Sequence, residues 1–379
     1  MAEKLGIGIV GCGNISTAYF KLAPLFRGLE VRACADVFPA AAEARAAEFG
    51  ARAETVEGLL AAPDVDVVIN LTIPAAHFTV TKAALEAGKH VYSEKPFVLT
   101  IEEGLALRAL AQARGLSVGS APDTFLGGAP QQARKLIDEG ALGTITAGTA
   151  FVQSHGMEHW HPNPDFFFLP GGGPMLDLGP YYIADLINLI GPVRRVAAMT
   201  GAATPTRMLS AEGPRKGETV PVETPTTVQA LLEFANGAQV MMSTSWDVWA
   251  HRHAQPIELY GTEGTLFVPD PNWFGGTLEI GGRDGAIREV PAWEHPFGVP
   301  NDVRPNGTFA NYRAAGLADM AAAILDGREA RCGLDRALHA IDVMSAILHS
   351  GETGQFVALK TTCTRPEPLD PEAARALLA

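Results

Sequence analysis

The sequence predicts an α/β protein: a doubly wound parallel sheet, followed by an α+β part with a large, mainly antiparallel open sheet. Up to about residue 124, short apolar segments alternate with helical segments, as in parallel strands joined by crossover helices. Residues 65–71 form a nearly continuous β-branched run, which is typical of a strand buried on both faces. Beyond residue 228, strand-like segments are joined by hairpin signals such as Asn236-Gly237.

The first strand and helix form a candidate phosphate site. Residues 5–10 are an apolar run of strand length, Gly11-Cys12-Gly13 interrupts it, and a helix is expected from Asn14 to Phe20. A glycine turn leaves room for a ligand, and the start of a helix offers free N–H groups and positive dipole to an anion. Ser16 stands where the dinucleotide fingerprint has Gly or Ala. A tight structural turn is the alternative interpretation.

The second strand completes the pattern of a dinucleotide site. It is expected at residues 31–35 and ends in Asp36, which lies 23 residues after Gly13. An acid at the tip of this strand is where a ribose diol would bind. Because strand, turn, helix, strand and acid follow in this order, we expect dinucleotide binding.

Three further segments are expected at the same edge of the sheet. Helices are predicted at 39–49, 75–87 and 100–114, and strands at 90–93 and 116–120. The segments 72–74, 94–96 and 121–124 follow strands, and ligands of doubly wound sheets bind beyond the carboxyl ends of the strands.

Lys95 is the candidate catalytic cation at this edge. A solvated surface lysine is the ordinary alternative. Pro96 follows it and keeps it out of the helical region of backbone conformation. A cation fixed near a nicotinamide could bind a substrate hydroxyl and stabilise the developing alkoxide.

Length and charge limit the classes of function. A chain of 379 residues suits about two domains, and we divide it into residues 1–124 and 125–379. The net charge of -13 argues against nucleic acid as a partner. No apolar run approaches the roughly 20 residues that span a bilayer, and a strand begins within a few residues of the N-terminus. The four cysteines show no C-x-x-C spacing, so we expect a cytoplasmic protein with reduced thiols and no membrane partner.

The second half contains a loop rich in aromatic and histidine residues after a helix at 131–139 and a strand at 145–153. Trp160 and His161 are its candidate substrate residues, because a sugar pocket needs an apolar surface for the C–H faces of the sugar and polar groups for its hydroxyls. A packed lid that does not touch substrate is the alternative. His159 and His161 lack a third ligand at a usual interval, so no metal is expected.

A glycine run leads into an apolar helix predicted at residues 174–190. On a continuous helix Asp177 and Tyr181 share one face, and Asp185 continues the row. Burying a charged side chain on an apolar helix costs free energy unless the charge is paired or takes part in binding or catalysis. A buried acid–phenol pair that only steadies packing is the alternative.

The remaining segments predict the second sheet. Strands are expected at 228–234, 238–244, 257–260, 264–268, 278–280 and 287–290, after a long excursion at 204–225, and helices at 314–325 and 334–349. One sheet face has no helix assigned to cover it. We therefore expect a homodimer or homotetramer that pairs through this sheet.

Three motifs together resemble the glucose–fructose oxidoreductase / inositol dehydrogenase / MocA (Gfo/Idh/MocA) family. They are Gly11-Cys12-Gly13-Asn14-Ile15, Glu94-Lys95-Pro96, and the segment from Gly171 to Tyr181. The resemblance implies an N-terminal Rossmann domain, a C-terminal domain on a large sheet, and NAD(P)-linked oxidation or reduction of sugars, cyclitols and similar polyols. The cofactor-binding residues that follow are Gly11, Gly13, Asn14, Ile15, Asp36, Thr72, Pro74, His77, Glu94 and Lys95.

The resemblance also implies catalytic roles. Lys95 would contact the reacting hydroxyl and the nicotinamide ribose, and Asp177 would orient a substrate hydroxyl or the phenol. Tyr181, where many relatives have His, would be the general acid/base. A phenol has an unperturbed pKa of about 10, so it needs a nearby cation such as Lys95 to work near neutrality.

The cofactor expected is NAD rather than NADP. Asp36 is followed by Val37 and Phe38, with no adjacent Arg or Ser to receive a 2′-phosphate, and its carboxylate would repel one. Two rival functions are a glycoside-cleaving enzyme that works through transient ring oxidation and a non-catalytic dinucleotide-binding sensor. The segment from Ala121 to Phe125 lacks the Asn-x-Arg pattern of many relatives, which leaves the sugar unassigned.

Overall fold

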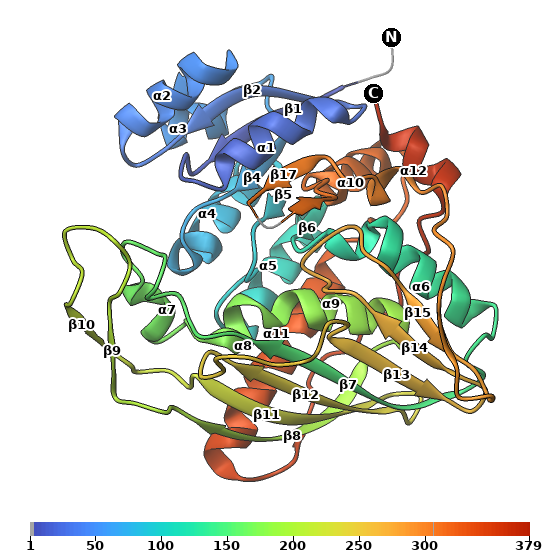
Figure 1. Ribbon diagram of the computed structural model, residues 1–379. Coiled ribbons are helices and arrows are strands. Elements are labelled where there is room, and N and C mark those ends of the chain that lie inside the picture. The colour runs from blue at the N-terminus through green and yellow to red at the C-terminus, as the bar shows by residue number, and fades with distance from the viewer. Residues whose placement is uncertain (1–3, 306) are drawn as a thin grey trace.

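The first sheet is parallel and doubly wound, as predicted. The structure is a computed structural model that describes residues 4–305 and 307–379. Within them, six strands pair in the order β3-β2-β1-β4-β5-β6, with helices on both faces (Figure 1). The strands are β1 (Leu5–Val10), β2 (Leu29–Ala35), β3 (Arg52–Glu54), β4 (Val67–Asn70), β5 (His90–Ser93) and β6 (Val118–Ser120). The connecting helices are α1 (Ser16–Leu22), η1 (Ala23–Leu25), α2 (Pro39–Phe49), α3 (Val56–Ala61), α4 (Pro74–Glu86) and α5 (Ile101–Arg114).

Local sequence explains where these helices begin and end. Thr100 accepts a hydrogen bond from the N–H of Glu103, and Glu103 returns one to Thr100, so α5 begins with a capping box. Gly50 and Gly115 end α2 and α5 in the left-handed conformation that glycine adopts without strain. The strand β3 and the helix α3 were not predicted. Arg52–Glu54 is short and carries no apolar run, so its sequence gives no strand signal.

The second sheet is mixed and mostly antiparallel. Its order is β16-β15-β14-β13-β7-β12-β11-β8-β19 within the described residues, and only β12 and β7 pair in parallel. The strands are β7 (Ile145–Gln153), β8 (Val193–Gly201), β11 (Thr227–Phe234), β12 (Gln239–Ser245), β13 (Ile257–Gly261), β14 (Thr265–Val268), β15 (Glu279–Gly281), β16 (Ile287–Glu289) and β19 (Val357–Ala358). This arrangement confirms the predicted fold class.

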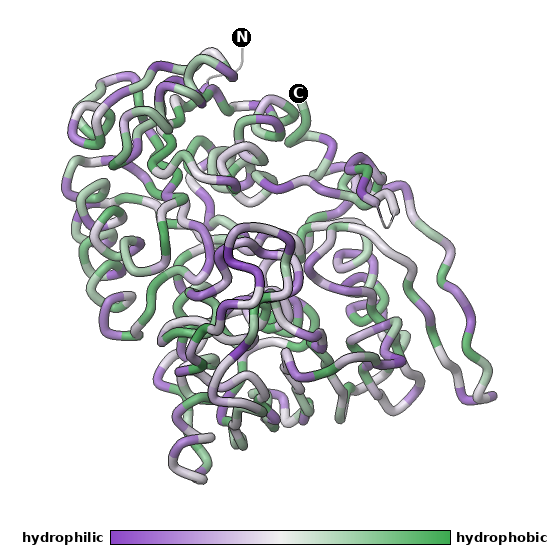
Figure 2. The backbone as a smooth tube through the Cα atoms, turned by 60° about the vertical axis from the view of Figure 1, so that its left-hand side comes forward, coloured by the Kyte–Doolittle hydropathy of each residue, from purple (hydrophilic) through white to green (hydrophobic). Residues whose placement is uncertain are grey.

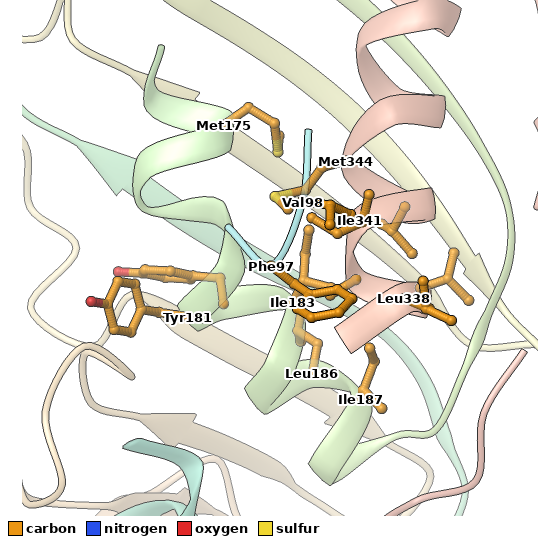
Figure 3. Packing of buried hydrophobic residues seen from close by; sticks show 14 of the residues in the cluster. Phe97, Val98, Met175, Tyr181, Ile183, Leu186, Ile187, Leu338, Ile341 and Met344 are labelled. Carbon is orange, nitrogen blue, oxygen red and sulfur yellow. The ribbon is translucent and has the colours of Figure 1, made fainter. Parts of the chain in front are cut away.

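Helices cover one face of this sheet. Along β11, Val228, Ala230 and Leu232 are buried, whereas the alternate residues Gln229 and Leu231 are exposed. The buried side packs against α8 (Pro174–Asp177), α9 (Gly179–Leu189) and α11 (Leu334–Thr353). Figure 3 shows Ile183, Leu186 and Ile187 of α9 packed toward Leu338 and Ile341 of α11. These apolar contacts fix α9 in the middle of the molecule.

The helix predicted at residues 174–190 is broken, which corrects the continuous row expected for Asp177, Tyr181 and Asp185. α8 ends at Asp177 and α9 starts at Gly179, with Leu178 between them. Pro180 has no N–H to donate to the carbonyl four residues earlier, so it interrupts the ladder and suits the first turn of a new helix. Only Tyr181 and Asp185 share the face of one helix.

The last part of the chain returns to the first sheet. α10 (Ala315–Asp326), η3 (Pro296–Gly298) and α12 (Pro371–Leu377) bury their apolar residues in the same cluster as β1 and β2. The N–H of Ser120 at the end of β6 donates to the carbonyl of Cys332, 3.0 Å away. Segments between β16 and β19, together with the C-terminal helix, therefore pack against the first sheet. The link between the sheets runs through η2 (Thr124–Leu126) and α6 (Gly128–Asp138).

The long excursion at residues 204–225 forms a two-stranded arm. β9 (Thr206–Met208) pairs antiparallel with β10 (Thr219–Pro221), and α7 (Asp165–Phe168) lies against the arm. Hydrophilic residues occupy the tip of the arm, as Figure 2 shows in a view that brings the arm forward. A second hairpin, β17 (Asp302–Arg304) and β18 (Gly307–Phe309), lies beside α10. No helix among the described residues is long and apolar enough to cross a bilayer.

We predict that Ile187→Ala destabilises the protein by about 2–5 kcal/mol, because Ile187 is fully buried between α9 and α11 and truncation leaves a cavity. The free energy of unfolding from urea titration measures the change. Ile287→Ala is the matched control, since Ile287 is 56% exposed on β16. Equal losses in the two variants would contradict the packing described.

Candidate active site

The turn after β1 is built for close approach. Gly11 has φ +101°, and a Cβ added there would come within 2.6 Å of the backbone of Leu71. A Cβ at Gly13 would meet nothing within 4 Å, so open space lies beside the turn. Ile15 precedes α1 and supplies no side-chain cap, while the hydroxyl of Ser16 donates to the carbonyl of Gly13 at 2.6 Å. The turn thus has the open backbone that a pyrophosphate needs.

Asp36 lies at the tip of β2, as the sequence indicated. Its Oδ2 accepts from the N–H of Cys12 at 2.7 Å, and its Oδ1 accepts from the N–H of Phe38 at 2.9 Å. Beside it is a cavity of about 570 Å³ whose described lining includes Asp36, Glu43, Glu54 and Glu57 and no Lys or Arg. This acidic lining fits an adenosine with free ribose hydroxyls and repels a 2′-phosphate.

Lys95 sits where β5 ends and reaches across to the second half of the chain. Its Nζ donates to the backbone oxygen of Asp177 at 2.6 Å and to Oδ1 of Asp177 at 2.8 Å. An ammonium has three N–H bonds, so one remains for a substrate oxygen. The side chains of Lys95 and Asp177 are 16% and 23% exposed, so the pair is largely buried but still reachable from solvent.

Tyr181 joins this pair from the first turn of α9. The Nζ of Lys95 lies 5.2 Å from the centre of its ring, and the ring points to the opposite side of α9 from Leu338 and Ile341 (Figure 3). Burial alone would lower the pKa of Lys95, but the negative charges that Tyr181, Asp177 and Glu94 can carry raise it above its ordinary value. Lys95 is therefore a cation at neutral pH. The structure brings together all three predicted catalytic residues.

The segments around Lys95 are tied together by Glu94 and His77. Glu94 accepts from the hydroxyl of Tyr19 at 2.9 Å and from the N–H of Lys95 at 2.9 Å. His77 is buried, and its ring nitrogens lie 2.6 Å from the carbonyl of Pro96 and 3.0 Å from that of Thr72. Pro74 opens α4 directly after Thr72. The structure places His77 between the two loops that flank the edge, where it fixes their spacing.

Arg313 and Asp123 lie close to Tyr181 and Glu94 and were not predicted as site residues. Arg313 donates to the side-chain oxygens of Asn272 and Asn311, both at 3.1 Å. Burial opposes the charge on Arg313, but neighbouring Tyr181, Asp123 and Glu94 raise its pKa above the ordinary value. The signal available in the sequence was a charged residue directly before the apolar helix at 314–325, and its partners are too distant in sequence to be inferred.

Asp123 occupies the buried exit of β6. It is 2% exposed, and its Oδ2 accepts from the N–H of Gly316 at 3.0 Å. Burial raises the pKa of Asp123 to about 6, although this hydrogen bond and Arg313 act in the opposite direction. Its charge therefore changes within the range of ordinary assay conditions.

The aromatic loop is joined to the segment before Asp177 through its backbone, since the N–H of Gly173 donates to the carbonyl of Phe167 at 2.8 Å. Trp160 is 57% exposed, and its ring lies 5.3 Å from that of His161 in an edge-on contact. His161 also meets the rings of Phe166 and Phe167, and Arg215 of the arm pairs with Asp165. No hydrogen bond or ring contact among the described residues links Trp160 or His161 to Lys95, Asp177 or Tyr181. The described residues also contain no cluster that could hold a metal ion.

Fold and site together define a dinucleotide-dependent oxidoreductase with two sheets. The chain matches the NAD-binding Rossmann-fold oxidoreductase family over residues 5–121 and the GFO/IDH/MocA C-terminal domain over residues 131–267. It belongs to the Gfo/Idh/MocA family and is an NAD-dependent oxidoreductase, as the sequence motifs indicated.

Similar proteins of known name act on sugars and cyclitols. Levoglucosan dehydrogenase of Pseudarthrobacter phenanthrenivorans is 26% identical over 289 residues, 70% of this chain and 73% of that protein. Inositol 2-dehydrogenase of Rhizobium meliloti is 26% identical over 286 residues, 74% of this chain and 80% of that protein. The structure of levoglucosan dehydrogenase with NADH superposes with a TM-score of 0.81 at 22% identity, covering 95% of this chain and all of that one.

We predict that Asp123→Asn changes how stability depends on pH. The folded pKa is about 6, above the ordinary value of 3.8, so the native carboxyl holds a proton that the unfolded chain releases between these values. Wild-type stability therefore falls as pH rises from 4 to 6 through this group, and the variant escapes that loss. Relative to wild type, the free energy of unfolding of the variant should improve by on the order of 2–3 kcal/mol between pH 4 and pH 7. Parallel urea-derived curves for the two proteins would contradict this.

Proposed function

We propose that the protein moves a hydride between nicotinamide and a secondary hydroxyl of a sugar, cyclitol or related polyol. The observation that carries the proposal is the convergence of Lys95, Asp177 and Tyr181 beyond the carboxyl edge of the first sheet. In this scheme residues 1–124 hold the cofactor and residues 125–379 form the substrate and oligomerisation part. The named relatives act on compounds of this class.

The residues that would hold the dinucleotide are those that the sequence placed at this edge. Gly11, Gly13, Asn14 and Ile15 would receive the pyrophosphate, and Asp36 the adenosine ribose. Thr72, Pro74, His77 and Glu94 would shape the recess around the nicotinamide ribose, which Lys95 would also contact. When bound, the nicotinamide supplies the acceptor or donor of the hydride.

Residues of this chain would transfer the proton and stabilise the developing charge. In oxidation, the carbinol hydrogen would leave with its bonding electron pair as a hydride, which the bound nicotinamide would accept, and the hydroxyl proton would pass to the phenolate oxygen of Tyr181 as the carbonyl forms. The free N–H of Lys95 would stabilise the oxygen while negative charge develops on it. Since Oδ1 of Asp177 binds Lys95, its Oδ2 remains to accept from a second hydroxyl of the substrate. Reduction runs through the same contacts in reverse.

We predict that Lys95→Met and Tyr181→Phe each lower kcat/KM by about 100-fold or more, because each removes a group that acts on the reacting oxygen. The assay follows NADH absorbance with a panel of sugars and cyclitols, and NADH fluorescence checks cofactor binding. Lys82→Met is the matched control, because Lys82 is a half-exposed residue that pairs with Glu86 on α4. Wild-type turnover in either active-site variant would refute the proposed roles.

We further propose that the protein is a homodimer or homotetramer, with copies joined through the open face of the second sheet. Leu231 and Met241 are 56% and 37% exposed on this face and lie opposite each other in the β11–β12 pair. Met199, on the neighbouring strand β8, is 77% exposed. Together they form an apolar surface of the kind that association buries.

We predict that Leu231→Glu dissociates the oligomer, because it places a charge in an apolar interface. Sedimentation velocity of the variant should give the mass of one chain, 40.0 kDa. Val303→Glu on the β17–β18 hairpin is the control, since Val303 is 82% exposed and lies off this sheet. An unchanged mass for Leu231→Glu would place the contact elsewhere.

A further inference from the structure

The phenol of Tyr181 needs a hydrogen-bond donor that Lys95 cannot supply. The Nζ of Lys95 already donates to the backbone oxygen and to Oδ1 of Asp177, so one of its three N–H bonds remains. In the proposed reaction that N–H serves the substrate oxygen. Tyr181 is only 9% exposed, and a largely buried phenolate is costly unless a donor meets it. A second donor is therefore expected beside Tyr181.

Arg313 is placed to be that donor. Its guanidinium forms a side-chain hydrogen bond with Tyr181. Burial opposes the charge on Arg313, but the charge of Tyr181 and this hydrogen bond raise the pKa of Arg313 above its ordinary value. Figure 3 shows the phenol projecting from α9 on the side away from Leu338 and Ile341, so the packing with α11 does not enclose its hydroxyl.

The partners that hold Arg313 leave its charge uncompensated. Nη1 donates to Oδ1 of Asn311 and Nη2 donates to Oδ1 of Asn272, both at 3.1 Å, and both partners are neutral amides. Arg313 forms no ion pair with a carboxylate in the described part of the chain, whereas Lys95 is paired with Asp177. The positive charge of Arg313 therefore acts on nearby groups without a direct counter-ion.

A chain of hydrogen bonds fixes Arg313 relative to α9. The N–H of Asn272 donates to Oδ1 of Asp270 at 3.0 Å, and the hydroxyl of Tyr182 donates to the same oxygen at 3.2 Å. Tyr182 follows Tyr181 on α9, so the loop that carries Asn272 is tied to the helix that carries the phenol. The position of the guanidinium beside Tyr181 is thus set by two elements at once.

The backbone after Arg313 is strained. Ala314 has φ +85°, and among residues 4–305 and 307–379 it is the one non-glycine residue in the left-handed region. It is fully buried at the N-cap of α10. A left-handed alanine costs free energy and persists only where the surrounding structure demands it, as happens at active sites. The strain falls directly beside the residue that meets Tyr181.

We propose that Arg313 is a positioning residue for the general acid/base. It holds the oxygen of Tyr181 and stabilises the phenolate, which leaves the free N–H of Lys95 for the substrate oxygen. Arg313 keeps all its protons, and the proton of the substrate hydroxyl still passes to Tyr181. The catalytic consequence rests on the proposed function, whereas the contact itself does not. The alternatives are that Arg313 binds substrate directly, or that it only links Asn272 to the β17–β18 hairpin.

Tyrosinate absorbance of the full chain without cofactor tests the contact. The near-ultraviolet absorbance is followed as pH rises, and the signal of Tyr181 is the difference between each protein and its Tyr181→Phe counterpart. We expect Arg313→Gln to move the midpoint of that signal upward by about one pH unit or more, because the cation that favours the phenolate is gone. Arg304→Gln is the matched control. Arg304 lies on the β17–β18 hairpin and pairs with Asp302, so its loss should leave the midpoint unchanged.

A second variant keeps this test valid if Arg313→Gln does not fold. Asn272→Asp keeps the size and the acceptor of the side chain but places a carboxylate on Arg313, so it should also raise the midpoint. The other charged groups near Tyr181 and Arg313 are unchanged in both variants: Glu94, Lys95, Asp123 and Asp177. A midpoint that stays at the wild-type pH in either folded variant would overturn the proposal, whatever happens to turnover.

Steady-state kinetics with a polyol that the wild type oxidises tests the catalytic consequence. We expect Arg313→Gln to lower kcat by about 10-fold or more with little change in KM, and the acidic limb of the kcat–pH profile to move upward with the tyrosinate midpoint. Arg313→Lys, which keeps the charge, should recover part of kcat. A rise in KM alone would indicate direct substrate binding, and an unshifted limb would indicate a structural link; either overturns the proposal. A wild type that oxidises no polyol would instead contradict the proposed function and leave the absorbance test standing.

Discussion

The ion pair between Lys95 and Asp177 joins the two halves of the site. Its partners are 82 residues apart, and two hydrogen bonds of 2.6 and 2.8 Å hold them. Removing both charges from water costs several kcal/mol per ion, so the pair forms only because its geometry is good and its remaining lone pairs and protons have further use. The unused N–H of Lys95 and the second oxygen of Asp177 meet that requirement when they face a polyhydroxy ligand.

Contacts on both sides of this pair hold it in place. On one side, Glu94 and His77 anchor the segment after β5 through Tyr19, Pro96 and Thr72. On the other side, the apolar packing of α9 against α11 fixes the turn that carries Asp177 and Tyr181. The side chains of Lys95 and Asp177 are therefore ordered before substrate binds, so little conformational entropy is lost on binding.

Local patterns predicted the parts of the site that depend on one segment each. A glycine turn, an acid at a strand tip and a lysine before proline are visible without partners, and the structure places Gly11, Asp36 and Lys95 where those patterns indicated. Arg313 could not be found this way, because its significance lies in Tyr181 and Asn272, which are far away in sequence. β3 was missed for a related reason: pairing with β2 in the folded sheet, rather than its own composition, makes it a strand.

The break at Leu178 shows how a wrong prediction can lead to a correct grouping. Helical spacing suggested that Asp177 and Tyr181 share a face, yet Pro180 ends one helix and starts another between them. They nevertheless lie at one site, because Lys95 contacts both residues. Its Nζ lies 5.2 Å from the centre of the Tyr181 ring and also binds the backbone oxygen of Asp177, at the end of α8. A carbonyl released from a helical ladder needs a donor, and the ammonium supplies it. In a continuous helix the N–H of Tyr181 would donate to that carbonyl. Here it donates to the carbonyl of Leu178 at 3.1 Å, so the break in the helix leaves the carbonyl of Asp177 to Lys95.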